Sequence, residues 1–220
     1  NLEDSIQVQK AADLKFFSFG IKKENADVNI IDVKANPFVE INFSNLIIKS
    51  HLIGLYNANN INAALTIGKY FGVDDIAIKE GLESYIPENN RSQLLSKGTN
   101  QIILDAYNAN PSSMKVAIEN FLQLDNPNKI MILGDMFELG DASTQEHLEV
   151  LKLLLDKNEI QCFFIGSAFY ANKTVTTHFH FYETFDSFSE YLKEIKIVNS
   201  VVLIKGSRGM ALERTLQFFS

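Results

Sequence analysis

The stretch that decides the fold runs from Gln101 to Leu133 and is QIILDAYNANPSSMKVAIENFLQLDNPNKIMIL. An apolar strand pattern at Gln101–Leu104 precedes a polar loop, and apolar residues then recur at helical spacing over Ser112–Leu124. A second apolar strand follows at Lys129–Leu133. Two nearly continuous apolar strands joined by an amphipathic helix predict parallel strands in a sheet that is covered on both faces. The fold class predicted is therefore α/β.

The same alternation continues toward the C-terminus. We expect strands at Gln161–Ile165, Phe179–Tyr182 and Val201–Ile204, and helices at Ser143–Leu155, near Ala168, at Phe185–Ile195 and from about Met210. Together these elements predict a Rossmann-like, mostly parallel sheet. Because such sheets bind ligands beyond the C-terminal ends of their strands, chemistry is expected in the loops at Asp105, Gly134, Gly166 and Lys205.

The first 85 or so residues have a different pattern. Short strand-like runs separated by turn residues predict an antiparallel meander; they are Lys15–Phe19, Val28–Val33, Phe38–Phe43 and Leu46–Ile48. A helix with Asn57 as N-cap should run to Phe71, and Asp74 should cap a second helix to about Tyr85. The polar break Pro87–Asn90 predicts a domain boundary, giving domains 1–88 and 89–220.

Composition narrows the class of protein. The chain has 220 residues, of which 46% are hydrophobic, and a formal net charge of −7, so a nucleic-acid partner is not expected. No apolar run is long enough to span a membrane, and we expect no membrane partner. Cys162 is the only cysteine, which excludes an internal disulfide and suits a cytoplasmic protein. The chain begins at Asn1 without an initiator Met, and we expect it to be a fragment.

Two loops carry polar groups that suit a nucleotide. In Asp105–Met114 a strand delivers a carboxylate and two amides; the carboxylate suits a ribose, and the following helix start suits an anion. A plain turn with an N-cap explains the same residues equally well. Lys205–Met210 supplies two cations, two glycines and a hydroxyl, which favours a phosphate or carboxylate site over a solvated turn.

Two further segments are less specific. In Gly134–Gly140, Asp135 and Glu138 can orient a substrate or a basic group, but capping of a nearby helix is the favoured interpretation, and His147 is expected to be structural. Four Asn residues within Asn57–Asn62 are an unusual helix start, and amides of this kind can recognise a purine edge. His178 and His180 lack a third ligand, so no metal site is predicted.

These segments, in this order, resemble the Mur ligase family, and within it the branch that adds D-alanyl-D-alanine. The family pattern has an HN-x-x-N-x-x-AA helix start, an Arg at the entry to the third domain, and D-x-YNAN-P-x-SM, GDM-x-ELG and KGSRGM loops. The chain matches it at Asn57, Asn60, Arg91, Asp105–Met114, Gly134–Gly140 and Lys205–Met210. The resemblance covers nearly the whole chain, with departures at Tyr56, where His is usual, and at Asn90, where Gly is common.

The resemblance implies that residues 1–88 end a central ATP-binding domain and that residues 89–220 form the C-terminal domain. It implies cofactor-binding roles for Asn57, Asn60, Arg91, Asp105 and Tyr107. It implies catalytic roles for Asn108, Asn110, Lys205, Ser207 and Arg208, with Lys205 and Ser207 near the reacting phosphate or the incoming dipeptide.

The implied reaction joins D-alanyl-D-alanine to UDP-N-acetylmuramoyl-tripeptide through an acyl phosphate, using ATP and Mg²⁺, in peptidoglycan precursor synthesis. The chain contains no Gly-x-x-x-x-Gly-Lys-Ser/Thr phosphate loop, so we expect it to be inactive alone. Two alternatives stay open. One is a folylpolyglutamate synthase-like ligase, although that branch usually has D-x-AHNP where this chain has YNANP. The other is a non-catalytic nucleotide-binding module.

Overall fold

A computed structural model describes residues 1–14 and 16–219 of the chain, which divides into two compact units, Asn1–Pro87 and Glu88–Ser220. The elements of the first unit are α1 (Ser5–Ala11), β1 (Phe19–Ile21), β2 (Val28–Ala35), β3 (Phe38–Phe43), β4 (Leu46–Ile53), α2 (Asn57–Tyr70) and α3 (Asp75–Ser84). In the described part of the chain no helix combines the length and the apolar character needed to cross a membrane.

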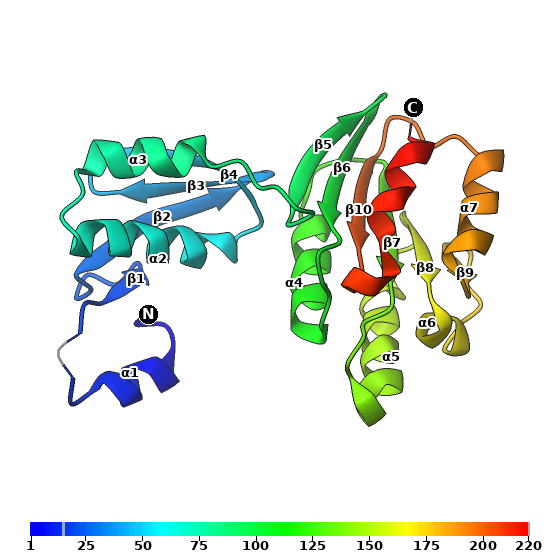
Figure 1. Ribbon diagram of the computed structural model, residues 1–220, viewed down its shortest axis with the longest axis horizontal. Helices are drawn as coiled ribbons and strands as arrows, with labels where there is room; N and C mark the ends of the chain where they lie inside the picture. Colours follow the sequence, from blue (N-terminus) through cyan, green and yellow to red (C-terminus); the bar gives the residue numbers. More distant parts are fainter. Residues whose placement is uncertain (15, 220) are drawn as a thin grey trace. The chain divides into compact units, whose positions relative to one another are not determined.

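The first unit is a four-stranded sheet in the order β1-β2-β3-β4, with α2 and α3 packed on its buried residues (Figure 1). The predicted antiparallel meander is confirmed for β2, β3 and β4 and is wrong for β1, which pairs with β2 in parallel. The Asp27 carboxylate accepts hydrogen bonds from the backbone N–H and hydroxyl of Ser18 at 2.7 and 2.6 Å. These bonds hold the start of β2 beside the start of β1. The predicted strand Lys15–Phe19 begins only at Phe19, and Lys15 lies outside the described residues.

The two helix caps predicted in this unit have different outcomes. Asp74 caps α3 as expected, accepting the N–H of Ile76 at 2.9 Å. Asn57 is not the N-cap of α2, so that prediction was wrong. Asn57 lies inside the first turn. Its backbone N–H donates to the Gly54 carbonyl, and the N–H of Ala58 donates to the Leu55 carbonyl, so the turn begins before Asn57. Its side chain is buried and donates to the Ile53 carbonyl at 2.7 Å.

The second unit confirms the α/β class. Its strands are β5 (Gln93–Lys97), β6 (Asn100–Asp105), β7 (Lys129–Gly134), β8 (Ile160–Ile165), β9 (Phe179–Tyr182) and β10 (Val201–Lys205). Its helices are α4 (Pro111–Leu122), α5 (Ser143–Leu154), α6 (Ser167–Ala171) and α7 (Phe185–Glu194), with 3-10 turns η1 (Gly140–Ala142), η2 (Arg208–Met210) and η3 (Leu212–Phe218).

The sheet order is β5-β6-β10-β7-β8-β9, and all neighbours are parallel except β5, which joins β6 as a hairpin. In the ribbon view α4, α5 and α6 cover one face of this sheet, while α7 and η3 cover the other (Figure 1). The second face packs Phe188 of α7 and Leu212 of η3 on strand residues such as Ile132 and Ile204. β10, the last strand in the sequence, therefore lies between β6 and β7.

The expected last helix from about Met210 is replaced by two 3-10 turns. Ala211 separates them, with φ at +47° in the left-handed region. This conformation stops an α-helix from forming across Met210–Leu212.

Candidate functional site

Four parallel strands end at the same edge of the second sheet, so the loops that follow them are neighbours. The register pairs Lys205 of β10 with Asp105 of β6 on one side and with Leu133 of β7 on the other. Gly134 of β7 pairs with Ile165 of β8. The loop after β10 consequently lies between the loops after β6 and β7, and three of the predicted motifs meet at this edge.

A buried ion pair joins β6 and β10. The Lys205 Nζ atom lies 2.6 Å from Asp105 Oδ2 and also donates to the Asn108 carbonyl at 3.2 Å. The side chain of Lys205 is 2% exposed and that of Asp105 is 17% exposed. The other carboxylate oxygen of Asp105 accepts from the N–H and the hydroxyl of Ser92 at 3.0 and 3.2 Å. Lys205 is thus held away from solvent, whereas Asp105 keeps a partly accessible edge.

Ser207 is buried as well, at 2% exposure. Its hydroxyl oxygen accepts the N–H of Phe137 at 2.8 Å, and its O–H donates to the Ala109 carbonyl at 3.3 Å. Its own N–H donates to the Asp135 carbonyl at 3.1 Å. Ser207 therefore bonds the loops that follow β6 and β7 to the loop that follows β10.

Two exposed arginines lie around an exposed tyrosine at this edge. The Arg91 guanidinium carbon is 3.6 Å from the centre of the Tyr107 ring, and that of Arg208 is 5.8 Å from it. Within residues 1–14 and 16–219 no carboxylate forms an ion pair with either arginine. Planar guanidinium groups suit phosphate and carboxylate, so the cluster of Arg91, Tyr107 and Arg208, here named the arginine cluster, is a candidate site for an anion.

Asn110 is the N-cap of α4. Its side chain accepts the N–H of Ser113 at 2.9 Å, and the Ser113 hydroxyl accepts the N–H of Asn110 at 3.1 Å, which completes a capping box. The helix begins at Pro111, one residue before the predicted Ser112. Asn108 is exposed and accepts the N–H of Ala109 at 2.9 Å. The turn-and-cap interpretation is therefore confirmed for Asn110, which leaves its exposed amide nitrogen as the group available to a ligand.

Asp135 and His147 are structural at this edge. The Asp135 carboxylate accepts the N–H groups of Ala168 and Phe169 at 2.9 and 3.0 Å, so it caps α6. His147 Nε2 accepts the N–H of Met136 at 3.0 Å, which leaves Nδ1 to donate to the Ser143 carbonyl at 2.7 Å. These bonds describe a neutral imidazole. The 3.6 Å approach of His147 to Asp135 is then a contact rather than an ion pair.

Glycines allow the loops to approach one another. A Cβ atom on Gly206 would lie 3.1 Å from the Gly134 Cα and 2.9 Å from a methyl group of Leu212. Gly166 has φ at +125°, and a Cβ atom there would lie 2.3 Å from the Asp135 carboxylate. A side chain at either glycine would separate the loops that follow β7, β8 and β10.

The predicted adenine residues Asn57 and Asn60 belong to the first unit. Asn60 donates from Nδ2 to Asn57 Oδ1 at 2.9 Å, so the two amides are bonded to each other. Nearby, the Oδ1 atoms of Asn59 and Asn62 are buried without a hydrogen-bond partner. The adenine role of this segment stays a prediction.

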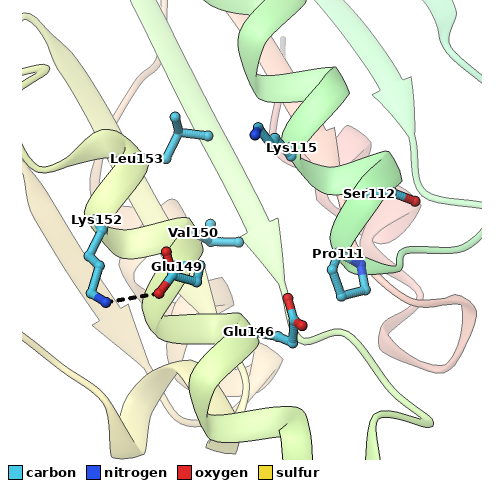
Figure 2. Close-up of a pocket in the computed structure, with 8 residues that line it drawn as sticks. All are labelled: Pro111, Ser112, Lys115, Glu146, Glu149, Val150, Lys152 and Leu153. Atoms are coloured by element: carbon cyan, nitrogen blue, oxygen red, sulfur yellow. Dashed lines mark hydrogen bonds and ion pairs between the residues drawn. The ribbon is translucent and has the colours of Figure 1, made fainter.

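A groove of about 550 Å³ lies between α4 and α5 of the second unit. Figure 2 shows its lining: Pro111, Ser112, Lys115, Glu146, Glu149, Val150, Lys152 and Leu153. None of the predicted site residues is among them, and Lys152 pairs with Glu149 at 2.8 Å with both side chains more than half exposed. Residue chemistry favours the arginine cluster over this groove as the functional site.

One contributor to the site, Ser92, was not predicted from the sequence. Ser92 supplies both donors to Asp105 Oδ1, and it follows Arg91 in a segment where Asn89, Asn90 and Ser92 all have positive φ. Three left-handed residues within four positions fold the chain tightly before β5. The run of Asn and Ser residues was the available signal, since Asn tolerates this conformation.

Comparison with known proteins gives the family. The family model described as "Mur ligase, glutamate ligase domain" matches residues 90–208, which is more than half of the chain. The chain belongs to the Mur ligase family.

Relatives within the Mur ligase family share one name. The UDP-N-acetylmuramoyl-tripeptide–D-alanyl-D-alanine ligase of Bacillus subtilis is 33% identical over 176 residues, which cover 76% of this chain and 38% of that protein. The ligase of the same name from Borreliella burgdorferi is 28% identical over 214 residues, covering 84% of this chain and 46% of that protein. The chain thus spans less than half the length of these Mur ligases.

Solved structures agree with this placement. A crystal structure of MurF from Acinetobacter baumannii is 27% identical, with a TM-score of 0.78, and covers 96% of this chain and 48% of that one. Two more distant structures show only that the fold is shared. MurF ligase from Thermotoga maritima in complex with ADP is 23% identical, with a TM-score of 0.77. A folylpolyglutamate synthase from Mycobacterium tuberculosis is 15% identical, with a TM-score of 0.58.

Proposed function

We propose that the protein to which this chain belongs is an ATP-dependent ligase that joins D-alanyl-D-alanine to UDP-N-acetylmuramoyl-tripeptide in peptidoglycan precursor synthesis. Mur ligases are ATP-dependent ligases, and two relatives named above carry this substrate pair in their names. The lone buried Cys162 suits a reducing compartment, and we place the enzyme in the cytoplasm.

The observation that carries the proposal is the arginine cluster beside Asp105. Both guanidinium groups are exposed and stack on or near one aromatic ring, and the accessible edge of a carboxylate lies at the end of the neighbouring strand. A carboxylate in this position suits ribose hydroxyls, and cations beside it suit phosphates. A carboxylate for the ribose and cations for the phosphates, at the C-terminal ends of parallel strands, suit a nucleoside triphosphate.

In the proposed reaction, ATP transfers its terminal phosphoryl group to the terminal carboxylate of the tripeptide and leaves as ADP. The amine of D-alanyl-D-alanine then attacks the acyl carbon, an amide bond forms, and phosphate and a proton are released. Arg91 and Arg208 would stabilise negative charge on the phosphates, Asp105 would orient the ribose, and Tyr107 would hold both guanidinium planes in place. Asn108 and Asn110 offer exposed amides for the same site. Residues 1–88 would be the end of the central ATP-binding domain, with Asn57 and Asn60 toward the adenine.

We propose that Mg²⁺ is held mainly by residues of the longer protein that lie outside this chain. Among the described residues no group of three His, Cys, Asp or Glu side chains could hold a metal ion, and the carboxylates of Asp105 and Asp135 are engaged by Lys205 or by backbone N–H groups. We therefore derive no step through Mg²⁺ from these residues.

The proposal is tested by comparing ATP kinetics of the Arg91→Ala and Arg208→Ala variants with the wild type. The protein used is a ligase polypeptide that contains this chain and a phosphate-binding domain. Each substitution removes a charge-assisted contact of roughly 1.5–3 kcal/mol, which lowers kcat/KM for ATP by about tenfold to a hundredfold. Lys196→Ala is the matched control, because Lys196 is an exposed cation just before β10, at the opposite edge of the sheet. Product formation is followed by mass spectrometry together with phosphate release.

Three results would contradict the proposal. Unchanged ATP kinetics in both arginine variants would remove the arginine cluster from the active site. Glutamate addition to a folate by the wild-type polypeptide, without ligation of D-alanyl-D-alanine, would favour the folylpolyglutamate synthase-like alternative. A polypeptide that binds ATP and ligates neither substrate would favour the non-catalytic nucleotide-binding module.

A further inference from the structure

Asp135 connects three loops through four hydrogen bonds. Its carboxylate accepts from the N–H groups of Ala168 and Phe169 after β8. Its backbone N–H donates to the Ile165 carbonyl at 3.0 Å, and its backbone carbonyl accepts the N–H of Ser207 after β10 at 3.1 Å. Asp135 is 3% exposed, so a substrate cannot reach its carboxylate while these bonds are in place.

Ser207 extends the same network to the loop after β6 and bonds a second time to the loop after β7. Its hydroxyl accepts the N–H of Phe137 and donates to the Ala109 carbonyl. The single hydroxyl hydrogen is therefore used within the protein. Phe137 and Arg208, which directly follow Asp135–Met136 and Ser207 in the chain, are exposed. The buried network thus ends in exposed side chains at the edge where the arginine cluster lies.

The surrounding packing leaves this network little freedom. The Asp135 carboxylate fills the space where a Gly166 side chain would lie, at 2.3 Å from the Cβ position. A Cβ atom on Gly209 would lie 2.8 Å from the Phe137 ring. Close-packed groups of this kind have few alternative arrangements, so a break in one bond should shift the loops rather than be absorbed locally.

We propose that Asp135 is a positioning residue which, with Ser207 as its link, fixes the loops that carry Arg208 and Phe137. Neither residue touches a substrate; both act by holding Arg208 in the place where it meets an anion. The inference rests on the proposed function only for what Arg208 does. The coupling between the loops is a property of this chain and can be tested without activity.

The first test is amide hydrogen exchange on the chain of 220 residues. In Asp135→Ala, the Ala168 and Phe169 amides lose a charge-assisted acceptor and should exchange roughly tenfold to a hundredfold faster. The Ser207 and Phe137 amides, whose acceptors remain in the sequence, should also exchange about tenfold faster. Faster exchange at 168 and 169 alone would overturn the proposal.

Two further variants control this experiment. Ser207→Ala deletes only a buried hydroxyl and is the safer variant to fold; it should release the Phe137 amide and, because the loops are coupled, also speed exchange at Ala168 and Phe169, though less than Asp135→Ala does. Asp141→Asn removes an exposed carboxylate from the same loop and should leave all four amides as in the wild type. Protection of the Phe137 amide in Ser207→Ala would overturn the role of Ser207 as the link.

The second test is kinetic, in the longer ligase. Ser207→Ala should lower kcat/KM for ATP by about tenfold when it is assayed well below the melting temperature of the variant. Combined with Arg208→Ala it should add less than about twofold, because Ser207 acts through Arg208. Multiplicative losses would mean that Ser207 contacts a substrate directly, which overturns the proposal. If the wild-type ligase is inactive, the proposed function fails while the exchange experiment still decides the coupling.

Discussion

Replacing Lys205 with Met removes a buried charge and keeps most of the side-chain stem. The Lys205 ammonium lies 2.6 Å from Asp105 at 2% exposure. Removing one partner of a buried ion pair typically costs about 3–5 kcal/mol, because the other charge is left in a poorly solvated place. Asp105 retains both donors of Ser92 and is 17% exposed. We therefore expect the lower end, about 3 kcal/mol.

The assay is urea unfolding of the whole chain, followed by circular dichroism and fitted with one transition for each unit. Only the transition of the second unit should move, and Lys196→Met, an exposed substitution of the same kind, should change it by less than about 0.5 kcal/mol. The double variant Lys205→Met with Asp105→Asn should be no less stable than Lys205→Met alone, since the uncompensated charge is gone. A loss below about 1 kcal/mol in Lys205→Met would refute the description of the pair as buried and mutually dependent.

Four other outcomes are expected. Residues 89–220 expressed alone should unfold cooperatively, because their sheet and cores are complete within that range; a collapsed, dye-binding state without a sharp transition would contradict this. The chain of 220 residues should bind ATP in the millimolar range or more weakly, about 4 kcal/mol or less, and should not hydrolyse it; micromolar affinity in calorimetry or turnover above a blank would mean that this chain alone holds the groups that grip the triphosphate. Burial raises the pKa of the Cys162 thiol to about 12, so at pH 8 about one thiol in ten thousand is ionised. A thiol reagent should therefore label Cys162 only as fast as the second unit opens, and immediate labelling of the folded protein would disprove the burial. Asn110→Ala should lower the stability of the second unit by about 1 kcal/mol through loss of the α4 cap, and an unchanged urea midpoint would show that the capping box contributes little.

Periodicity predicted most of the second unit because its strands are buried on both faces. β6, β7, β8 and β10 are apolar through most of their length, and the helices between them carry one apolar face each. β5 was missed because its residues are half-buried or exposed and do not alternate. A hairpin at the edge of the sheet needs no apolar pattern of its own, since β6 supplies its hydrogen bonds.

The loops of the site were predicted from the sequence, and the roles given to their residues stay predictions. Lys205 and Ser207 were expected near the reacting groups because the resemblance to the Mur ligase family implied it. Both are buried, because the sheet order places β10 beside β6 and brings Lys205 level with Asp105. Strand order depends on contacts between residues about a hundred positions apart, and no local pattern contains that information. Arg91 and Arg208 are exposed, so their accessibility could be expected without knowledge of the strand order.

The position of β10 also determines when the second unit can form during synthesis. β10 is the last strand of the sheet to leave the ribosome, yet it separates β6 from β7. Until residues 201–205 emerge, the two strands on either side of it have no partner between them, and their apolar edges stay open to chaperones or to other chains. A polypeptide that stops before Val201 lacks the middle of its sheet together with Lys205 and Ser207. Premature termination there should yield a degraded chain rather than a weakened enzyme.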